Sequence, residues 1–331
     1  MQGTGEPIAD ARQRFEYSKV VMGSRARVVL HAASEQDAAA AAAEAFGVMS
    51  RLEAVMSDYR ADSEAMRLMR RSPRELHDVS VDLAGVLALS EWVWGLSDGA
   101  FDVTLGALTH RWRIARREGV LPSEEERAGL LGRSGMGLLE LDEDSGRVRF
   151  GRAGMVLDFG GIGKGHAAQC ALDHLRLLGH PDSLVEIGGD LVVGEAPPGL
   201  DGWTVAIETG LGEGDRETRV LSHAAVATSG DAEQFVEIDG VRYSHLIDPR
   251  TGLGLSERIA VTVVLRARYL SWYGFEYQDW PPDRPTRGLL GGCADALASA
   301  ISVAGARRGR EIADAAGEYF EIEAVIVTAG E

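Results

Sequence analysis

The pattern of apolar and polar positions predicts mainly helices in the first half of the chain. The run VVMGSRARVVL, from Val20 to Leu30, alternates with a period of two and predicts one strand. A long helix is expected next, because Ser34 is a suitable N-cap and an alanine-rich stretch follows it. Segments 80–102 and 104–137 are also expected to be helical, the second being polar and interrupted by loops.

The second half of the chain carries mostly strand patterns. Turn residues between short alternating segments predict a hairpin within 138–158, and a helix over 163–178 follows. A later helix over 294–309 and a last strand over 323–330 are preceded by strand-like runs at 183–195, 203–209, 224–230, 234–248 and 258–266. Helices followed by strands favour an α+β fold over a regular βαβ alternation.

We expect a single domain over 18–331, preceded by a flexible segment at 1–17. The stretch 267–292 interrupts the periodicity and concentrates aromatic residues and prolines. Long irregular stretches of this kind are typical of functional insertions or lids, so an insertion is expected there.

The charge of the chain limits its ligands. The 331 residues include 51 acidic and 34 basic side chains, a net charge of -17, which disfavours binding to nucleic acid or to an anionic membrane surface. The negative charge of an anionic ligand must therefore be balanced by local positive groups or by a metal. The two cysteines, Cys170 and Cys293, have no metal-ligand spacing, so neither structural zinc nor a disulfide framework is expected.

The sequence predicts no membrane span and no signal peptide. The N-terminus has no apolar core and no cysteine that could carry a lipid, and no window of eighteen apolar residues occurs. As written, the chain is expected to be cytoplasmic. A periplasmic or membrane-anchored location would require a signal trimmed from a longer precursor.

The stretch LDFGGIGKGHAA, residues 157–168, has the composition of a phosphate-binding loop at the start of a helix. It is not a Walker loop. The residue five positions before Gly163 is Asp158, and the residue after Lys164 is a glycine rather than serine or threonine.

Three interpretations of this stretch remain open. A degraded dinucleotide fingerprint is formed by Gly163, Gly165 and Ala168, with Glu186 as its acid. In a second interpretation Asp158 belongs to the site, next to a nucleotide and a bound cation that offsets the repulsion between carboxylate and phosphate. The third is a glycine-rich helix start with a surface lysine.

Two further segments carry candidate binding or catalytic groups. In SDGAFDVTLG, Phe101 can cover a ring and Asp102 can accept hydrogen bonds from a ligand, although a buried phenylalanine with a capping aspartate is the simpler explanation. In YSHLIDPRTG, His245 lies at a strand end before a turn and is the best candidate for acid–base chemistry near neutral pH. A structural histidine would show the same pattern.

The segment GGCADALASAIS suggests a cation site. Asp295 and Ser299 are four positions apart on one helix, so their oxygens point the same way. Such ligands suit Mg²⁺, which accepts a partial protein shell completed by water and phosphate. An acid that stabilises the helix dipole is the alternative.

Taken in order, these motifs closely resemble those of the ApbE family, the FAD:protein FMN transferases. The resemblance covers about residues 18–330 and also includes MGS, LVEIGGDL and ATSGD. It implies a T-fold-like α+β architecture with mixed sheets flanked by helices. It also implies FAD as substrate, Mg²⁺ as cofactor, and transfer of FMN by a phosphoester bond to a threonine or serine of an acceptor protein. Some members instead hydrolyse FAD to FMN and AMP.

The resemblance also assigns roles to individual residues of this chain. His245 would be the catalytic base. The metal ligands would be the Gly161 carbonyl, Asp295 and Ser299. The residues expected to contact FAD or to line its site are Met22, Tyr59, Ala100, Phe101, Asp102, Asp158, Lys164 and Leu246.

The chain departs from the family pattern at several positions. Ser24 and Ser299 stand where threonine is usual, and Ala298 stands where some members have a further aspartate. Glu186 and Met69 replace frequent asparagines. Two other functions stay open: an FAD pyrophosphatase that uses the same site with water as acceptor, and, because the metal helix is altered, an FAD-binding protein without catalysis. The insertion at 267–292 lies next to the expected site, where it would select the acceptor.

Overall fold

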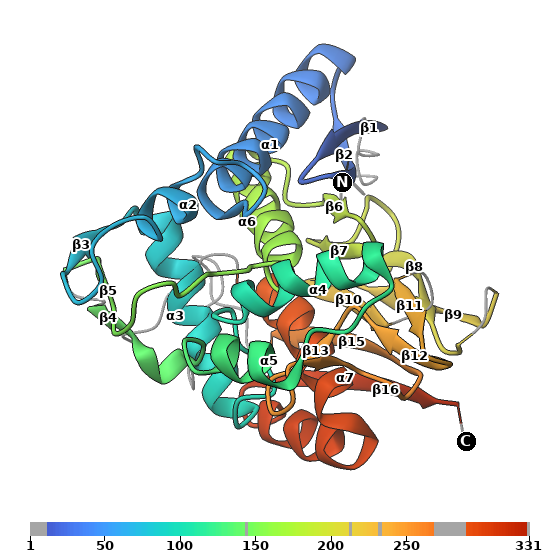
Figure 1. The fold of residues 1–331 in the computed structure, drawn as a ribbon. Coiled ribbons are helices and arrows are strands. Elements are labelled where there is room, and N and C mark those ends of the chain that lie inside the picture. Colours follow the sequence, from blue (N-terminus) through green and yellow to red (C-terminus); the bar gives the residue numbers. More distant parts are fainter. Residues whose placement is uncertain (1–11, 143–144, 212–213, 231–233, 268–288, 330–331) are drawn as a thin grey trace, which may run out of the picture.

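A seven-stranded antiparallel sheet forms the centre of the computed structural model, which describes residues 12–142, 145–211, 214–230, 234–267 and 289–329 (Figure 1). Every neighbouring pair of strands in the sheet is antiparallel. In spatial order the strands are β1 (Gln13–Val21), β2 (Ser24–Ala32), β6 (Leu184–Ile187), β7 (Asp190–Val193), β10 (Ala224–Gly230), β15 (Ile259–Ala267) and β16 (Phe320–Thr328).

The N-terminal strand pair corrects two expectations. The single strand predicted from Val20 to Leu30 is wrong, because β1 and β2 form a hairpin whose turn is Met22 and Gly23, both with positive φ. Positive φ at both central residues is the geometry of tight hairpin turns. The apolar alternation continues through this turn and therefore hides it. In addition, β1 begins at Gln13, inside the segment 1–17 that was expected to be flexible.

Helices cover one face of the sheet. As predicted, Ser34 caps the first helix by accepting a hydrogen bond from Asp37 N–H. The helices on this side are α1 (Glu35–Met56), α6 (Gly163–Leu177) and α7 (Leu289–Ala316), with α3 (Val81–Leu96) packed against α7. Between α6 and α7, a Cβ on Gly165 would come within 2.1 Å of the Gly291 carbonyl oxygen, so glycine is what allows these helices to approach so closely.

Helix α7 is apolar enough and long enough to cross a membrane, but 83% of its most apolar window is buried inside the protein. It packs on α6, β10 and β15 in the main core, as a core helix does. The helix also begins at Leu289, so the end of the expected insertion 267–292 is helical. The remainder of that insertion, residues 268–288, lies outside the described residues.

A two-stranded ribbon covers the other face of the sheet. It consists of β8 (Trp203–Glu208) and β9 (Arg216–Leu221), and the inward side chains of β8 alternate with exposed ones. Trp203 and Val205 pack there against Val29 and Val264. The strand β9 was not predicted, because its sequence RETRVL is mostly polar.

A smaller group of elements lies beside the sheet and contributes one side of the site. Here α4 (Gly106–Glu118) and α5 (Glu124–Leu131) pack against the short strand pair β13 (Ile247–Asp248) and β14 (Leu253–Gly254) through a second small core. Trp112 Nε1 of α4 donates to the Ser244 carbonyl oxygen at 3.0 Å, which fixes the chain just before residue 245.

Short elements complete the α+β fold. The hairpin predicted within 138–158 is present as β4 and β5. The remaining elements are α2 (Glu64–Leu68), β3 (His77–Asp78), η1 (Met136–Leu138), β4 (Leu139–Asp142), β5 (Arg147–Phe150), β11 (Phe235–Ile238) and β12 (Val241–Ser244).

Candidate functional site

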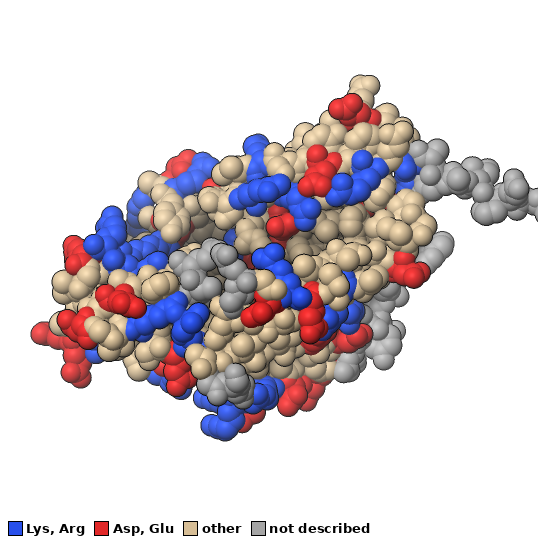
Figure 2. All heavy atoms as spheres, turned by 90° about the vertical axis from the view of Figure 1, so that its right-hand side faces the viewer, with Lys and Arg blue, Asp and Glu red and all other residues tan. Residues whose placement is uncertain are grey.

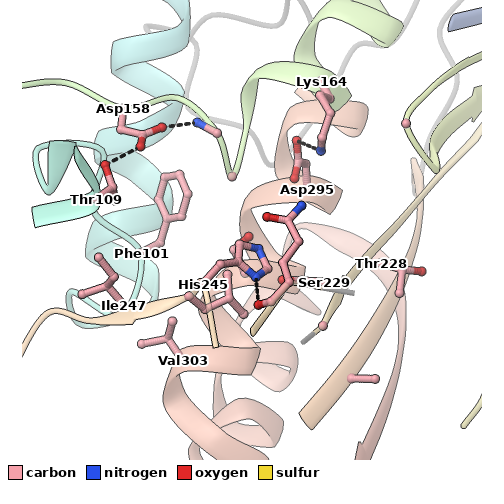
Figure 3. A pocket seen from close by; sticks show the side chains of 18 of the residues that line it. Phe101, Thr109, Asp158, Lys164, Thr228, Ser229, His245, Ile247, Asp295 and Val303 are labelled. Carbon is pink, nitrogen blue, oxygen red and sulfur yellow. Dashed lines mark hydrogen bonds and ion pairs between the residues drawn. The ribbon is translucent and has the colours of Figure 1, made fainter. Parts of the chain in front are cut away.

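A cavity of about 970 Å³ brings the predicted site residues together. Figure 3 shows Asp158 and Thr109 on one side of it, Lys164 and Asp295 on another, and His245 below them. All predicted site residues line this cavity except Met22. The Met22 methyl instead lies 3.5 Å from where a Cβ on Gly163 would be, so it packs against the start of α6.

The Asp158 carboxylate organises the glycine loop. Oδ1 accepts from the Gly160 N–H at 2.8 Å. Oδ2 accepts from Thr109 Oγ1 at 2.6 Å and from Arg113 Nη2 at 3.0 Å. Asp158 therefore lines the cavity, as the second interpretation of the loop required. Its hydrogen bond from the Gly160 N–H also holds the backbone that follows it.

Lys164 lies between two carboxylates. Its ammonium is paired with Asp190 and lies 3.7 Å from Asp295 Oδ2. Burial opposes the charged ammonium, but Asp295 and Asp190 outweigh it and raise the pKa of Lys164. The lysine is therefore a fixed cation on the cavity wall, not the surface lysine of the third interpretation.

The residues expected to hold a metal meet at the start of the loop. Ser299 Oγ lies 2.9 Å, and Phe101 Cε2 3.4 Å, from the position of a Cβ on Gly161. Asp295 is one turn away on α7, and its Oδ2 accepts from the Gly165 N–H at 3.1 Å. Glycine at position 161 thus allows the loop backbone to contact α7.

These groups fit a hard divalent cation. The described residues contain no cluster of three or more His, Cys, Asp or Glu side chains, so a cation here would complete its shell with backbone, water and phosphate oxygens, as Mg²⁺ does. Lys164, Asp190 and Asp295 together carry one excess negative charge when both acids are ionised. Burial, and then the charge of Asp295, raises the pKa of Asp190 to about 7. A bound cation would favour the ionised carboxylate and so oppose this rise.

His245 contacts the Gln234 carbonyl oxygen through both its ring and its backbone. Its Nδ1 lies 3.2 Å from the Gln234 carbonyl oxygen, to which its backbone N–H also donates. Because a carbonyl only accepts, Nδ1 carries the proton of the neutral ring and Nε2 is the basic nitrogen. The ring faces the same cavity as Lys164 and Asp295 (Figure 3).

Asp102 is mainly structural in this geometry. Its Oδ1 accepts from the backbone and side chain of Thr104, at 2.7 and 2.6 Å, and its Oδ2 accepts from the Met136 N–H at 3.2 Å. Burial raises the pKa of Asp102, and these hydrogen bonds oppose the rise. Phe101 is buried, as the simpler explanation given by the sequence expected, but Asp102 does not cap a helix, because the N-cap of α4 is Leu105, which has no side-chain cap hydrogen bond.

The position of Glu186 excludes the dinucleotide interpretation of the loop. Its Oε2 accepts from Arg27 Nε at 2.9 Å and lies 2.7 Å from Arg27 Nη2, and the two residues are paired across β2 and β6. The cavity lining does not include it. The acid that would bind a ribose in a dinucleotide fold is therefore an ion-pair partner on the sheet.

Sequence reasoning missed several residues of the site. Arg113 lines the cavity and donates to both Asp58 and Asp158. Asp190, which pairs with Lys164, was also missed. The pattern HRWRIARREG signals a basic amphipathic helix, but only the fold shows which of its arginines faces the site.

Comparison with known proteins identifies the family. The sequence model of the ApbE family matches residues 22–271. The chain belongs to the ApbE family. An FAD:protein FMN transferase of Vibrio cholerae is 30% identical to this ApbE family member over 265 residues, which are 78% of this chain and 72% of that protein. One of Treponema pallidum is 32% identical over 271 residues, 76% and 74% of the two chains.

Solved structures agree with this assignment. The apo form of the Pseudomonas stutzeri flavinyl transferase ApbE matches this ApbE family member with a TM-score of 0.77 and 26% identity, over 96% of this chain and 94% of that one. The expected α+β fold and the expected family are therefore confirmed. The expected enzyme class, transferase, is confirmed by the names of the relatives.

Proposed function

We propose that this protein is an Mg²⁺-dependent FAD:protein FMN transferase that attaches FMN by a phosphoester bond to a threonine or serine of an acceptor protein. The observation that carries the proposal is the meeting of Lys164, Asp295, Ser299 and the glycine loop on the wall of one cavity. The names of the relatives support FAD and an acceptor protein as the two substrates.

The size and lining of the cavity support a large, partly aromatic and anionic substrate. Ligand pockets usually measure about 300–1,000 Å³, and 970 Å³ is near the top of that range. Phe101 and Tyr59 supply aromatic surface, while Lys164, Arg113 and Arg116 supply positive charge. In a chain of net charge -17 these basic side chains, together with a bound cation, would offset the negative charge of phosphates.

The reaction has a defined balance of bonds and protons. The acceptor hydroxyl forms a bond to the phosphorus on the FMN side of the pyrophosphate, and the bond from that phosphorus to the AMP oxygen breaks. AMP leaves with the electron pair, and the hydroxyl proton passes to a base. His245 Nε2 is our candidate for that base, because the Gln234 carbonyl orients the ring with Nδ1 protonated.

Asp295, Ser299 and the Gly161 carbonyl would hold the metal. A divalent cation bound there neutralises charge on the phosphates. Lys164 adds a second positive charge, fixed by Asp190, and the glycines at 160 and 161 let phosphate oxygens approach the backbone.

The acceptor is proposed to be a protein and not a nucleic acid. On the face shown in Figure 2, acidic and basic side chains are interspersed among the atoms that the structure describes. Such a mixed surface, on a chain of net charge -17, does not attract a polyanion.

The test is to incubate the purified protein with FAD, Mg²⁺ and a threonine-bearing acceptor protein, and to compare it with the acceptor in which that threonine is alanine. We expect a covalent FMN adduct on the threonine form alone. FMN and AMP without an adduct would make the protein a pyrophosphatase, and bound but unchanged FAD would make it a binding protein; either result refutes the proposal.

A further inference from the structure

Arg113 connects three parts of the cavity wall. Its Nη2 donates to Asp158 at 3.0 Å, and its Nη1 donates to Asp58 at 2.6 Å. Its guanidinium carbon also lies 4.5 Å from the centroid of the Tyr59 ring. Arg113, Tyr59 and Asp158 line the cavity, whereas Asp58 does not. One side chain therefore donates to a loop acid and also contacts the ring of Tyr59, a residue that is 77% exposed.

Most of the acceptor capacity of Asp158 is used inside the protein. Arg113, Thr109 and the Gly160 N–H all donate to it. A carboxylate has about four acceptor positions, so only about one is left for a ligand. Asp158 acts mainly by holding the loop, and Arg113 and Thr109 set its orientation.

The loop that Asp158 holds leads directly to the candidate metal site. Gly160, which donates to Asp158, is followed by Gly161, whose Cα approaches Ser299 closely enough that a Cβ would lie 2.9 Å from Oγ. A small shift of the carboxylate would thus move the Gly161 carbonyl relative to α7. Two hydrogen bonds, from Arg113 to Asp158 and from the Gly160 N–H to Asp158, thus connect Arg113 to the backbone next to Gly161.

Asp58, which does not line the cavity, binds Arg113 and holds it in place. Its side chain is 9% exposed, and its Oδ2 accepts from His110 Nε2 at 2.9 Å as well as from Arg113. Burial opposes its ionisation, but the hydrogen bonds from His110 and Arg113 lower the pKa of Asp58. His110 and Arg113 are three positions apart on α4, so they lie on one helix face.

We propose that Arg113 is a positioning residue for FAD: through Asp158 it sets the glycine loop, and through its contact with the Tyr59 ring it sets an aromatic part of the cavity wall. The inference rests on the proposed function for the identity of the ligand. It does not require Arg113 to touch the reacting atoms.

The test compares Arg113→Ala with Arg111→Ala. Arg111 is on the same helix and is also ion-paired, with Glu126 at 2.6 Å, but it does not line the cavity. We measure the Kd for FAD by titration without acceptor, the Mg²⁺ concentration that half-saturates FAD cleavage, and the Tm. Arg113→Ala is expected to raise the Kd for FAD and the half-saturating Mg²⁺ concentration by about tenfold or more, the usual effect of losing a partner that orients a ligand. Arg111→Ala is expected to leave both unchanged.

A second variant separates positioning from folding. Arg113→Lys keeps the charge, but an ammonium lacks the planar fork that reaches two carboxylates. Arg113→Lys is expected to have the Tm of the wild type, while its affinity for FAD stays below that of the wild type. Recovery of both, or equal losses in Arg113→Ala and Arg111→Ala, would overturn the proposal.

The proposed function and this proposal fail in different ways. Wild-type protein that binds FAD but transfers no FMN refutes the function, while the Kd comparison still decides the role of Arg113. Wild-type protein that binds no FAD overturns both.

Discussion

Ser299 lies directly against Gly161, with its Oγ 2.9 Å from the position that a Cβ on residue 161 would occupy. This contact joins helix α7 to the glycine loop, two segments far apart in the sequence. It leaves no room for a side chain at position 161, and it places a hydroxyl next to the loop backbone.

Gly161→Ala is therefore expected to impair the site without unfolding the protein. The new methyl would push Ser299 or the loop away, and the site would need a higher Mg²⁺ concentration for FAD cleavage. The measurement is the Mg²⁺ dependence of FMN transfer, with the Tm as a check. Gly47→Ala is the control, since a Cβ on this α1 glycine meets nothing within 4 Å and alanine favours helix. An unchanged Mg²⁺ requirement in Gly161→Ala would contradict the account.

Asp295→Ala is expected to abolish metal-dependent turnover while some FAD binding survives. The carboxylate is buried on α7 and faces Lys164 and the Gly165 N–H, so its loss removes the charged ligand at the candidate metal site. Ser299→Ala should cost less and Ser299→Thr should retain activity, because the hydroxyl is what the site requires. Turnover and FAD binding measured on the three variants test this order. Normal turnover of Asp295→Ala would exclude it as a ligand.

The stability contributed by Asp58 is expected to depend on pH. His110 and Arg113 overcome burial and lower its pKa below the ordinary value of 3.8. Its contribution is therefore complete above about pH 4 and is lost as the pH falls through the lowered pKa of the folded state.

The measurement is the free energy of unfolding of the wild type and of Asp58→Asn between pH 7 and pH 3. Below about pH 4 the difference between the two should shrink as the pH falls. Asp62→Asn is the control, because Asp62 forms an exposed pair with Arg60 that should contribute little at any pH. A difference that grows in acid would contradict the prediction.

Met69 is expected to stabilise the segment at Leu157, where the glycine loop begins. Its sulfur accepts from the buried Leu157 N–H at 2.9 Å. Met69→Ala would leave that N–H without an acceptor, at a cost of about 1–3 kcal/mol. Met69→Asn should cost less, because its amide oxygen can accept. Chemical denaturation measures both, and equal losses would show that the hydrogen bond is unimportant.

Local signals predicted much of the fold. The Ser34 cap and the alanine-rich stretch fix α1, and the turn residues fix the hairpin β4–β5, because both depend on neighbours in sequence. The turn at Met22 and Gly23 was missed because an apolar residue occupies a positive-φ position, so the alternation continues across it. The strand β9 was missed because its sequence is mostly polar, and all of its residues but Leu221 are at least partly exposed.

The site was predicted from family motifs, and its supporting contacts were not predictable. Arg113 reaches Asp58 and Asp158 across long sequence separations, and nothing in HRWRIARREG distinguishes it from Arg111. The pair of Glu186 and Arg27 likewise depends on the register between β2 and β6. Such pairings follow from tertiary packing, which spacing in a single sequence does not determine.

The most direct test of the central claim is the ratio of FMN attached to the acceptor to AMP released. The purified protein is incubated with FAD, Mg²⁺ and acceptor, and both products are quantified over time. The account predicts one attached FMN for each AMP, with neither product formed by Asp295→Ala. AMP released without attached FMN, or no AMP at all, would contradict it.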